Sequence, residues 1–79
     1  MNEKSVDINT LGGMLRSFRR ASGLKQKEVE CATQAKISKY ECNVVIPSKR
    51  TLQKLIILYN VPDEKALVLL SLREVNKKR

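Results

Sequence analysis

The chain has 79 residues, with 16 lysines and arginines against 8 aspartates and glutamates, and a formal net charge of +8 at pH 7. This length suffices for one small domain with a thin core, so a partner or a dimer interface is expected. Two cysteines and no histidine are too few ligands for a zinc site and exclude histidine-assisted nucleophilic catalysis. Without a P-loop or a paired-carboxylate motif, the sequence predicts no enzyme, no metal and no cofactor.

Nothing in the sequence predicts a targeting or membrane-spanning segment. The first ten residues are polar, unlike a signal peptide, and the longest apolar run, LIILY at 55–59, is far too short to cross a bilayer. We therefore expect a cytoplasmic protein with no membrane association. In that reducing compartment a disulfide between Cys31 and Cys42 is not expected.

The positive charge is concentrated in one part of the chain. Residues 16–54 hold ten lysines and arginines and three carboxylates, a balance of +7 out of the total of +8. A basic folded segment, as opposed to a basic tail, favours a surface that meets a polyanion. The alternative is a single-sign surface that serves solubility alone.

Residues 1–10 are predicted to form a flexible N-terminal arm. The first helix is predicted at about 11–22, where the apolar residues share one face and arginines share the other (Leu11, Met14, Leu15, Phe18 and Ala21 against Arg16, Arg19 and Arg20). Glycines at 12 and 13 weaken its first turn, and Gly23 is placed to end it in a left-handed conformation.

A short second helix is predicted at about 25–31, with Val29 and Ala32 inward. The third is predicted over 33–42, capped by Thr33 and closed by Asn43. The helical period puts Ile37 and Tyr40 on its buried side. The opposite side is polar, small or positive and has no carboxylate (Gln34, Ala35, Ser38 and Lys39).

The segment VVIPS at 44–48 is predicted to be a loop because Pro47 prevents a helix before it. Its three aliphatic residues either form a second contact surface or pack under the next helix. That fourth helix is predicted at about 48–59, with Ser48 as its cap and Asn60 at its end. It buries Leu52, Leu55, Ile56 and Tyr59.

A fifth helix is predicted at 63–76, followed by a basic tail at 77–79. It carries two apolar stripes, one of Val68, Leu69, Leu72 and Val75 and the other of Ala66, Leu67 and Leu70. We expect one stripe to close the core and the second, assigned to Ala66, Leu67 and Leu70, to form a homodimer interface. The alternative is a core helix covered on both sides.

Cations stand at the starts of three helices, where the helix dipole disfavours them. They are Lys25 and Lys27, Lys36, and Lys49 with Arg50. A phosphate at such an end would meet both the free N–H groups and the side-chain charge, so this placement favours an external anion. The alternative is chance in a basic protein.

Three motifs occur in a familiar order: LGGMLRSFRRASGLKQKEV, TQAKISKYECN and PSKRTLQKLIILYNV. Over about residues 11–62 the chain resembles the helix-turn-helix domain of the lambda repressor and Cro type, the Xre family. The resemblance implies an all-α, compact five-helix fold that docks a recognition helix in the major groove as a dimer on a near-palindromic operator. Two features depart from the family pattern: the chain is about three residues shorter between Val29 and Ile37, and Glu30 replaces a small residue.

Carried over by position, the resemblance implies that Gln34, Ala35 and Lys39 read bases. Glutamine can pair with adenine, lysine can donate to guanine and alanine can touch a thymine methyl group. It implies DNA-backbone contacts from Gln26, Lys27, Thr33, Lys36, Ser38, Asn43, Ser48, Lys49 and Arg50. Arg19 and Arg20 are expected to lie too far away for contact. The alternatives are a solvated face for Gln34 and Lys39 and a purely capping role for Thr33.

These features predict a sequence-specific transcriptional regulator of double-stranded DNA, a repressor without a separate ligand domain or small-molecule ligand. Such minimal regulators are typical of phages, plasmids and other mobile elements. The alternative is a protein-binding module on the same fold: an antirepressor, an antitoxin or an inhibitor of a nucleic-acid enzyme. The shortened motif, Glu30 and the aliphatic loop favour this alternative. The charged, aromatic-free face at 34–39 favours DNA, because protein interface cores are rich in aromatic residues and poor in charge.

Overall fold

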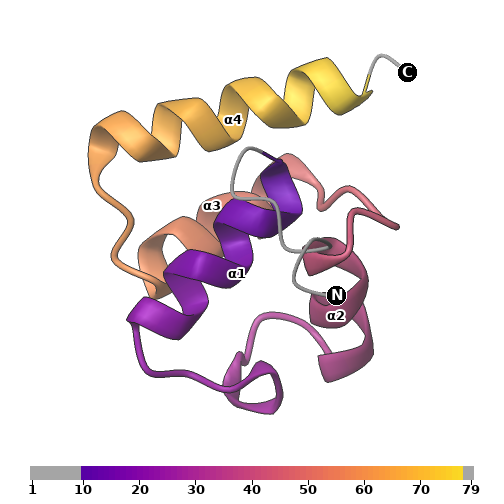
Figure 1. The fold of residues 1–79 in the computed structure, drawn as a ribbon, viewed down its shortest axis with the longest axis vertical. Coiled ribbons are helices and arrows are strands. Elements are labelled where there is room, and N and C mark those ends of the chain that lie inside the picture. The colour runs from indigo at the N-terminus through magenta and orange to yellow at the C-terminus, as the bar shows by residue number, and fades with distance from the viewer. Residues whose placement is uncertain (1–9, 78–79) are drawn as a thin grey trace, which may run out of the picture.

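The structure, a computed structural model, describes residues 10–77, with side chains through residue 75. Figure 1 shows four α-helices, α1 (Leu11–Ala21), α2 (Gln34–Glu41), α3 (Lys49–Leu58) and α4 (Asp63–Lys77), and a short 3-10 helix, η2 (Gln26–Glu28). Residues 10–77 contain no strand, so the all-α prediction is confirmed for this range. The expectation of five α-helices is wrong, because the predicted second helix is not an α-helix.

The predicted arm at 1–10 and the predicted basic tail at 77–79 lie outside the described residues, apart from Thr10 and Lys77. Thr10 is the N-cap of α1, and its side-chain oxygen accepts a hydrogen bond from the Gly13 amide at 3.0 Å. At the other end of α1, Gly23 has a φ of 77°. That left-handed conformation is nearly free of strain only for glycine and ends the helix where the sequence predicted.

The predicted helix at 25–31 is reduced to the single turn of η2. A Glu28 carboxylate oxygen accepts the Lys25 amide at 2.7 Å, which closes the turn on itself. Val29 then leaves the helical region, with φ −80° and ψ 113°, and its side chain is buried. With so few residues before α2, the backbone cannot continue a helix and also bring Val29 into the core. Its inward position, and the half-buried position of Ala32, were predicted.

The caps of the two following helices agree with the sequence-based prediction. The Thr33 hydroxyl accepts the Lys36 amide at 3.2 Å, and the Ser48 hydroxyl accepts the Thr51 amide at 3.2 Å. Asn43 and Asn60, which follow α2 and α3, have φ values of 61° and 55°. Asparagine tolerates this left-handed conformation better than other non-glycine residues, so both helices end where the sequence predicted.

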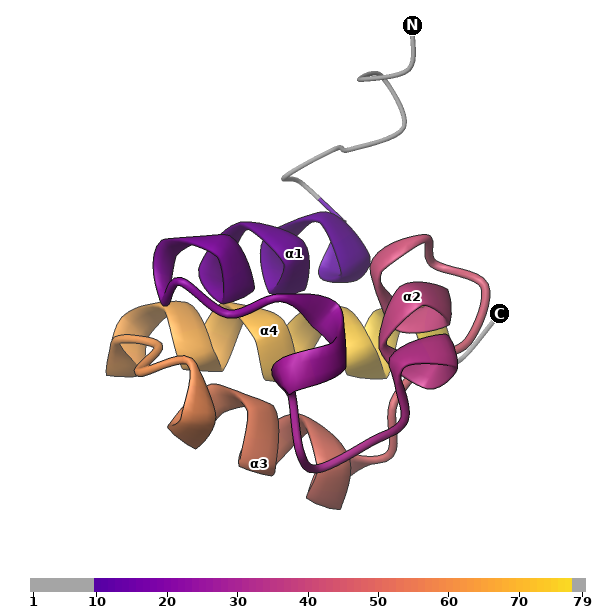
Figure 2. The same ribbon diagram turned by 90° about the horizontal axis from the view of Figure 1, so that it is seen from below.

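Figures 1 and 2 show α4 lying along α1 and α3, with α2 at one end of the molecule beside α1. The helices enclose one core. Its buried apolar residues come from every α-helix and from two connecting segments: Leu11, Leu15, Val29, Ile37, Tyr40, Leu52, Leu55, Tyr59, Val61 and Leu69. Within residues 10–77 no helix is both long enough and apolar enough to span a membrane.

The packing of α4 divides its apolar residues differently from the two predicted stripes. Leu69 is fully buried, and Ala66, Leu70 and Leu72 pack half-buried against the core. Leu67, Val68 and Val75 are exposed. Because α4 rests on α1 and α3 together, its buried face is broad and takes members of both stripes. Of the three residues predicted for dimerisation, only Leu67 points outward.

Candidate nucleic-acid interface

The exposed face of α2 is the polar face that the helical period predicts. Gln34, Ala35, Lys36 and Lys39 are exposed and Ser38 is half-buried. On the opposite side, Ile37 and Tyr40 are buried in the core. The three predicted base-reading residues therefore share one accessible surface.

The one carboxylate of α2, that of Glu41, does not reach this surface. Its two oxygens accept hydrogen bonds from Nε and a terminal nitrogen of Arg19 at 2.6 and 3.2 Å. The side chains of Arg19 and Glu41 are only 9% and 4% exposed. Arg19 also donates to the Leu24 carbonyl at 2.7 Å. Placing Arg19 with the solvent-facing arginines was wrong, because a buried carboxylate draws it into the interior.

Gln26 joins the same cluster. Its side-chain amide donates to Glu41 Oε1 at 3.0 Å and so ties η2 to the end of α2. The sequence assigned Gln26 to the DNA backbone, but this donor is engaged inside the protein. Burial raises the pKa of the neighbouring Tyr59 hydroxyl well above its ordinary value, the Glu41 charge raises it further, and Arg19 opposes the shift. Together, Arg19, Gln26 and Glu41 fix α2 against α1 and η2.

A second tie joins the end of α2 to the start of α1. Asn43 Oδ1 accepts the Gly12 amide at 2.9 Å, and its amide nitrogen donates to the Thr10 hydroxyl at 3.1 Å. The predicted DNA-backbone role of Asn43 therefore meets a side chain already engaged by α1. At Gly12 an added Cβ would lie 2.6 Å from the Glu41 carbonyl oxygen and 2.8 Å from Asn43 Oδ1. Glycine at 12 permits this close contact, a role its sequence position does not reveal.

The starts of α2 and α3 offer cations and no acid. Neither helix has an acidic residue in its first turn. Lys36, Lys49 and Arg50 are exposed there, as is Lys27 on η2. Thr33 and Ser48 serve as caps, as the sequence predicted, and both are exposed. The Ser48 hydroxyl also donates to the Thr51 hydroxyl oxygen at 3.0 Å, so its donor is engaged within α3.

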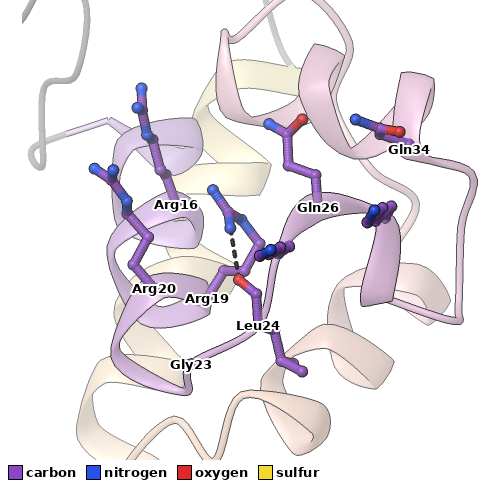
Figure 3. Close-up of a pocket in the computed structure, with 9 residues that line it drawn as sticks. Arg16, Arg19, Arg20, Gly23, Leu24, Gln26 and Gln34 are labelled. Carbon is purple, nitrogen blue, oxygen red and sulfur yellow. Dashed lines mark hydrogen bonds between the residues drawn. The ribbon is translucent and has the colours of Figure 1, made fainter.

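A basic groove continues from the first residue of α2 to the last turns of α1 (Figure 3). Its volume is about 670 Å³, and it is open to solvent. It brings the predicted residues Gln26, Lys27 and Gln34 together with Lys25, which the sequence analysis placed among the cations at helix starts, and with two arginines to which it assigned no contact, Arg16 and Arg20. The signal available in the sequence was the four-residue spacing of Arg16 and Arg20, which puts them on one side of a helix.

Two apolar surfaces accompany the polar one. Val44, Val45 and Ile46 are 68%, 40% and 39% exposed, so they do not pack under α3, and the alternative of a second contact surface stays a prediction. Pro47 next to them is buried, and its carbonyl accepts a hydrogen bond from Arg73 Nε at 3.0 Å. A separate apolar hollow of about 360 Å³ is lined by Glu30, Cys31, Lys54, Ile57 and Leu58.

No family model, curated protein or solved structure matches the chain. The resemblance to the Xre family therefore rests on the three sequence motifs alone. In the part of the chain that the structure describes, the two cysteines are free and no three acidic or cysteine side chains gather as metal ligands would.

Proposed function

We propose that the protein is a sequence-specific DNA-binding transcriptional regulator of the Xre type, with α2 as its recognition helix. The observation that carries this proposal is the exposed face of α2, where Gln34, Ala35 and Lys39 stand without a competing carboxylate. An α-helix with such a face fits the major groove of B-DNA in width and in charge. The lambda-repressor-like arrangement of the helices is part of the same proposal.

The side chains on this face suit the edges of bases. Gln34 offers both a donor and an acceptor, as an adenine requires in the major groove, and Lys39 donates to guanine acceptors. Ala35 between them is small enough to let the helix approach and to touch a thymine methyl group. Lys36, Lys49 and Arg50 supply the phosphate contacts that position the helix.

Rigid support of α2 favours recognition over loose electrostatic attachment. The helix is held at its end by the Arg19–Glu41 pair, by Gln26 and by the Asn43–Gly12 contact. A recognition element that is fixed before binding loses less conformational freedom when it docks. These hydrogen bonds lie on both sides of its C-terminal end. The residues at its N-terminal end, which include Gln34 and Ala35, stay exposed.

The proposed regulator acts as a homodimer on a palindromic operator and represses transcription from it. A single small domain contacts few base pairs, so two copies on two half-sites supply the affinity and the specificity that regulation needs. The exposed aliphatic residues of α4, Leu67, Val68 and Val75, are the proposed contact between copies. By the resemblance, the setting is the cytoplasm of a cell that carries a phage or another mobile element.

Selection from a random duplex library at two salt concentrations tests this function. We expect wild type to recover a palindromic site and to lose affinity steeply as salt rises. The variant Gln34→Ala/Lys39→Ala should lose selection far more than overall affinity. The variant Gln53→Ala/Lys54→Ala removes the same two residue types from exposed positions on α3 and should select the wild-type site. Unselective wild-type binding that neither variant alters contradicts the proposal.

A protein-binding module on the same fold is the second candidate, and the exposed loop at 44–46 favours it. Three consecutive exposed aliphatic residues are unusual on a surface that meets only DNA and solvent. This candidate predicts that Val45→Ser/Ile46→Ser abolishes the protein's biological activity in cells and leaves its selection of duplex sites unchanged. The DNA-binding proposal predicts that function in cells follows duplex selection across all of these variants.

A further inference from the structure

The groove between α1 and η2 differs from the face of α2 in its chemistry. It is lined by five cations and no carboxylate: Arg16, Arg19, Arg20, Lys25 and Lys27. We propose that this groove binds the phosphodiester backbone of a DNA strand, with Arg16 and Arg20 of α1 as its phosphate ligands. This inference rests on the proposed function and adds a contact surface, on a helix that the sequence placed out of reach of DNA.

The internal ion pairs leave most of the groove's charge available. Arg19 is neutralised by Glu41, whereas the other four cations form no ion pair or side-chain hydrogen bond within residues 10–77. Cations held this close together repel one another, and the Glu28 carboxylate, which is bound to the Lys25 amide, offsets only part of that repulsion. An anion in the groove removes that repulsion and is attracted by all four at once.

The guanidinium of Arg16 is only partly satisfied within the protein. Its Nε is buried and has no hydrogen-bond acceptor among the described residues. A buried N–H group without an acceptor costs free energy, and such groups are rare in folded proteins. The Nε atom itself is out of reach of solvent, so a phosphate oxygen in the groove would meet the two terminal nitrogens of Arg16, which have no partner among the described residues.

Arg16 and Arg20 are placed to act together. They are four residues apart on α1, and Figure 3 shows both extending from the same side of that helix. Arg20 is exposed, whereas Arg16 is half-buried. A strand passing along α1 would therefore meet two guanidinium groups one helical turn apart, a separation of roughly 6 Å, which is close to the spacing of neighbouring phosphates.

The groove also lies where a backbone strand would pass. Gln34 lines it and is at the same time the first residue of α2. If α2 occupies the major groove of DNA, the DNA strand that borders the major groove at the start of α2 continues over η2 toward α1. The openness of the site agrees, because enclosed cavities are typical of small-ligand sites and this one lies open to solvent.

The test compares Arg16→Gln/Arg20→Gln with Lys54→Gln/Lys65→Gln, which removes the same net charge from exposed positions on α3 and α4. Affinity is measured over a range of salt concentrations for a selected duplex and for a shuffled duplex. We expect the arginine variant to lose about tenfold in affinity per lost contact at 0.1 M salt, equally for both duplexes, and about two units of the salt slope. The control should lose far less.

Neutral methylphosphonate groups, placed at one phosphate of the duplex at a time, locate the contact. At one or two positions these groups should weaken duplex binding by wild type and leave duplex binding by the arginine variant unchanged. Arg20→Gln alone repeats the measurement with a substitution at an exposed position, in case the change at Arg16 affects folding, which thermal unfolding reports.

The outcomes separate the inference from the proposed function. If wild type selects a site and the arginine variant binds like the control, the groove inference is overturned and the regulator proposal stands. If wild type binds without selecting a site and the arginine variant still binds duplex more weakly than the control variant, the groove inference is supported and the base-reading proposal fails. If wild type binds no duplex, both are overturned.

Discussion

Arg19 and Glu41 join α1 to the end of α2 almost entirely out of contact with water. Removing one partner of such a pair leaves an uncompensated buried charge. We therefore expect Arg19→Met or Glu41→Met to lower the free energy of unfolding by about 3–5 kcal/mol. Arg19→Met/Glu41→Met should recover part of that loss, because neither charge then remains. Urea denaturation of the three variants measures the coupling between the two sites.

The matched control is Arg20→Met, at the next residue of the same helix, which is exposed. It should change the free energy of unfolding by no more than about 0.5 kcal/mol. Equal losses for Arg19→Met and Arg20→Met would show that the buried pair contributes nothing beyond an ordinary surface arginine.

Gly12 gives a prediction whose sign separates two physical effects. Helix propensity alone favours Gly12→Ala by about 0.5–1 kcal/mol. The carbonyl oxygens of Tyr40 and Glu41 lie where the new methyl group would stand. We expect this overlap to dominate and to destabilise the protein by about 1–3 kcal/mol. Ser17→Ala, at an exposed position on the same helix, is the control, and a rise in melting temperature for Gly12→Ala would contradict the close contact.

The predictability of the site differs from residue to residue for a physical reason. The exposed face with Gln34 and Lys39 follows from the helical period, which is a local property of the sequence. Arg19, Gln26 and Asn43 have partners 22, 15 and 31 residues away in sequence. Whether such polar residues face solvent or one another is decided by tertiary packing, so their internal roles could not be predicted.

At the scale of elements, local signals located most helix ends. Threonine and serine caps, left-handed asparagines and Gly23 act within one turn of the residue they occupy, and the structure places each as predicted. The segment at 25–31 is different because it is too short to be stable as a helix by itself. Its conformation is set by the burial of Val29. The sequence pattern predicts that burial, but it does not predict that the backbone leaves the helical conformation at Val29.

Two substitutions at Ser48 separate two properties of the start of α3: the stability of the helix and its proposed contact with a phosphate. Ser48→Ala should lower the free energy of unfolding by about 1 kcal/mol, because the Thr51 amide loses its acceptor. Ser48→Asp keeps the cap and adds a charge that the helix dipole favours, so thermal stability should equal or exceed that of wild type. The same aspartate repels phosphate, so duplex affinity should fall. Parallel changes in stability and affinity for both variants would contradict a phosphate contact at this end.

At the scale of the whole molecule, the exposed aliphatic residues of α4 predict a dimer. Leu67 is 66% exposed and lies on the same helix as Val68 and Val75. Leu67→Glu should shift the protein from dimer to monomer in sedimentation equilibrium and leave its helical content unchanged. Val44→Glu introduces the same charge at a comparably exposed position, 68%, in the loop after α2, and should leave the dimer intact. The opposite pattern would assign the dimer contact to the loop at 44–46.

For the whole molecule on DNA, we propose that α2 reads bases and that the other contacts hold it in place. The measurement that tests it most directly is a set of thermodynamic cycles between one side chain and one base pair. Each base pair of the selected site is exchanged in turn, and dissociation constants are measured for wild type, Gln34→Ala and Lys39→Ala. We predict that one exchange, costing wild type about 1–3 kcal/mol, costs Lys39→Ala nothing, and that a different exchange behaves this way for Gln34→Ala. Equal losses for all three proteins at every base pair would show that α2 does not read the sequence.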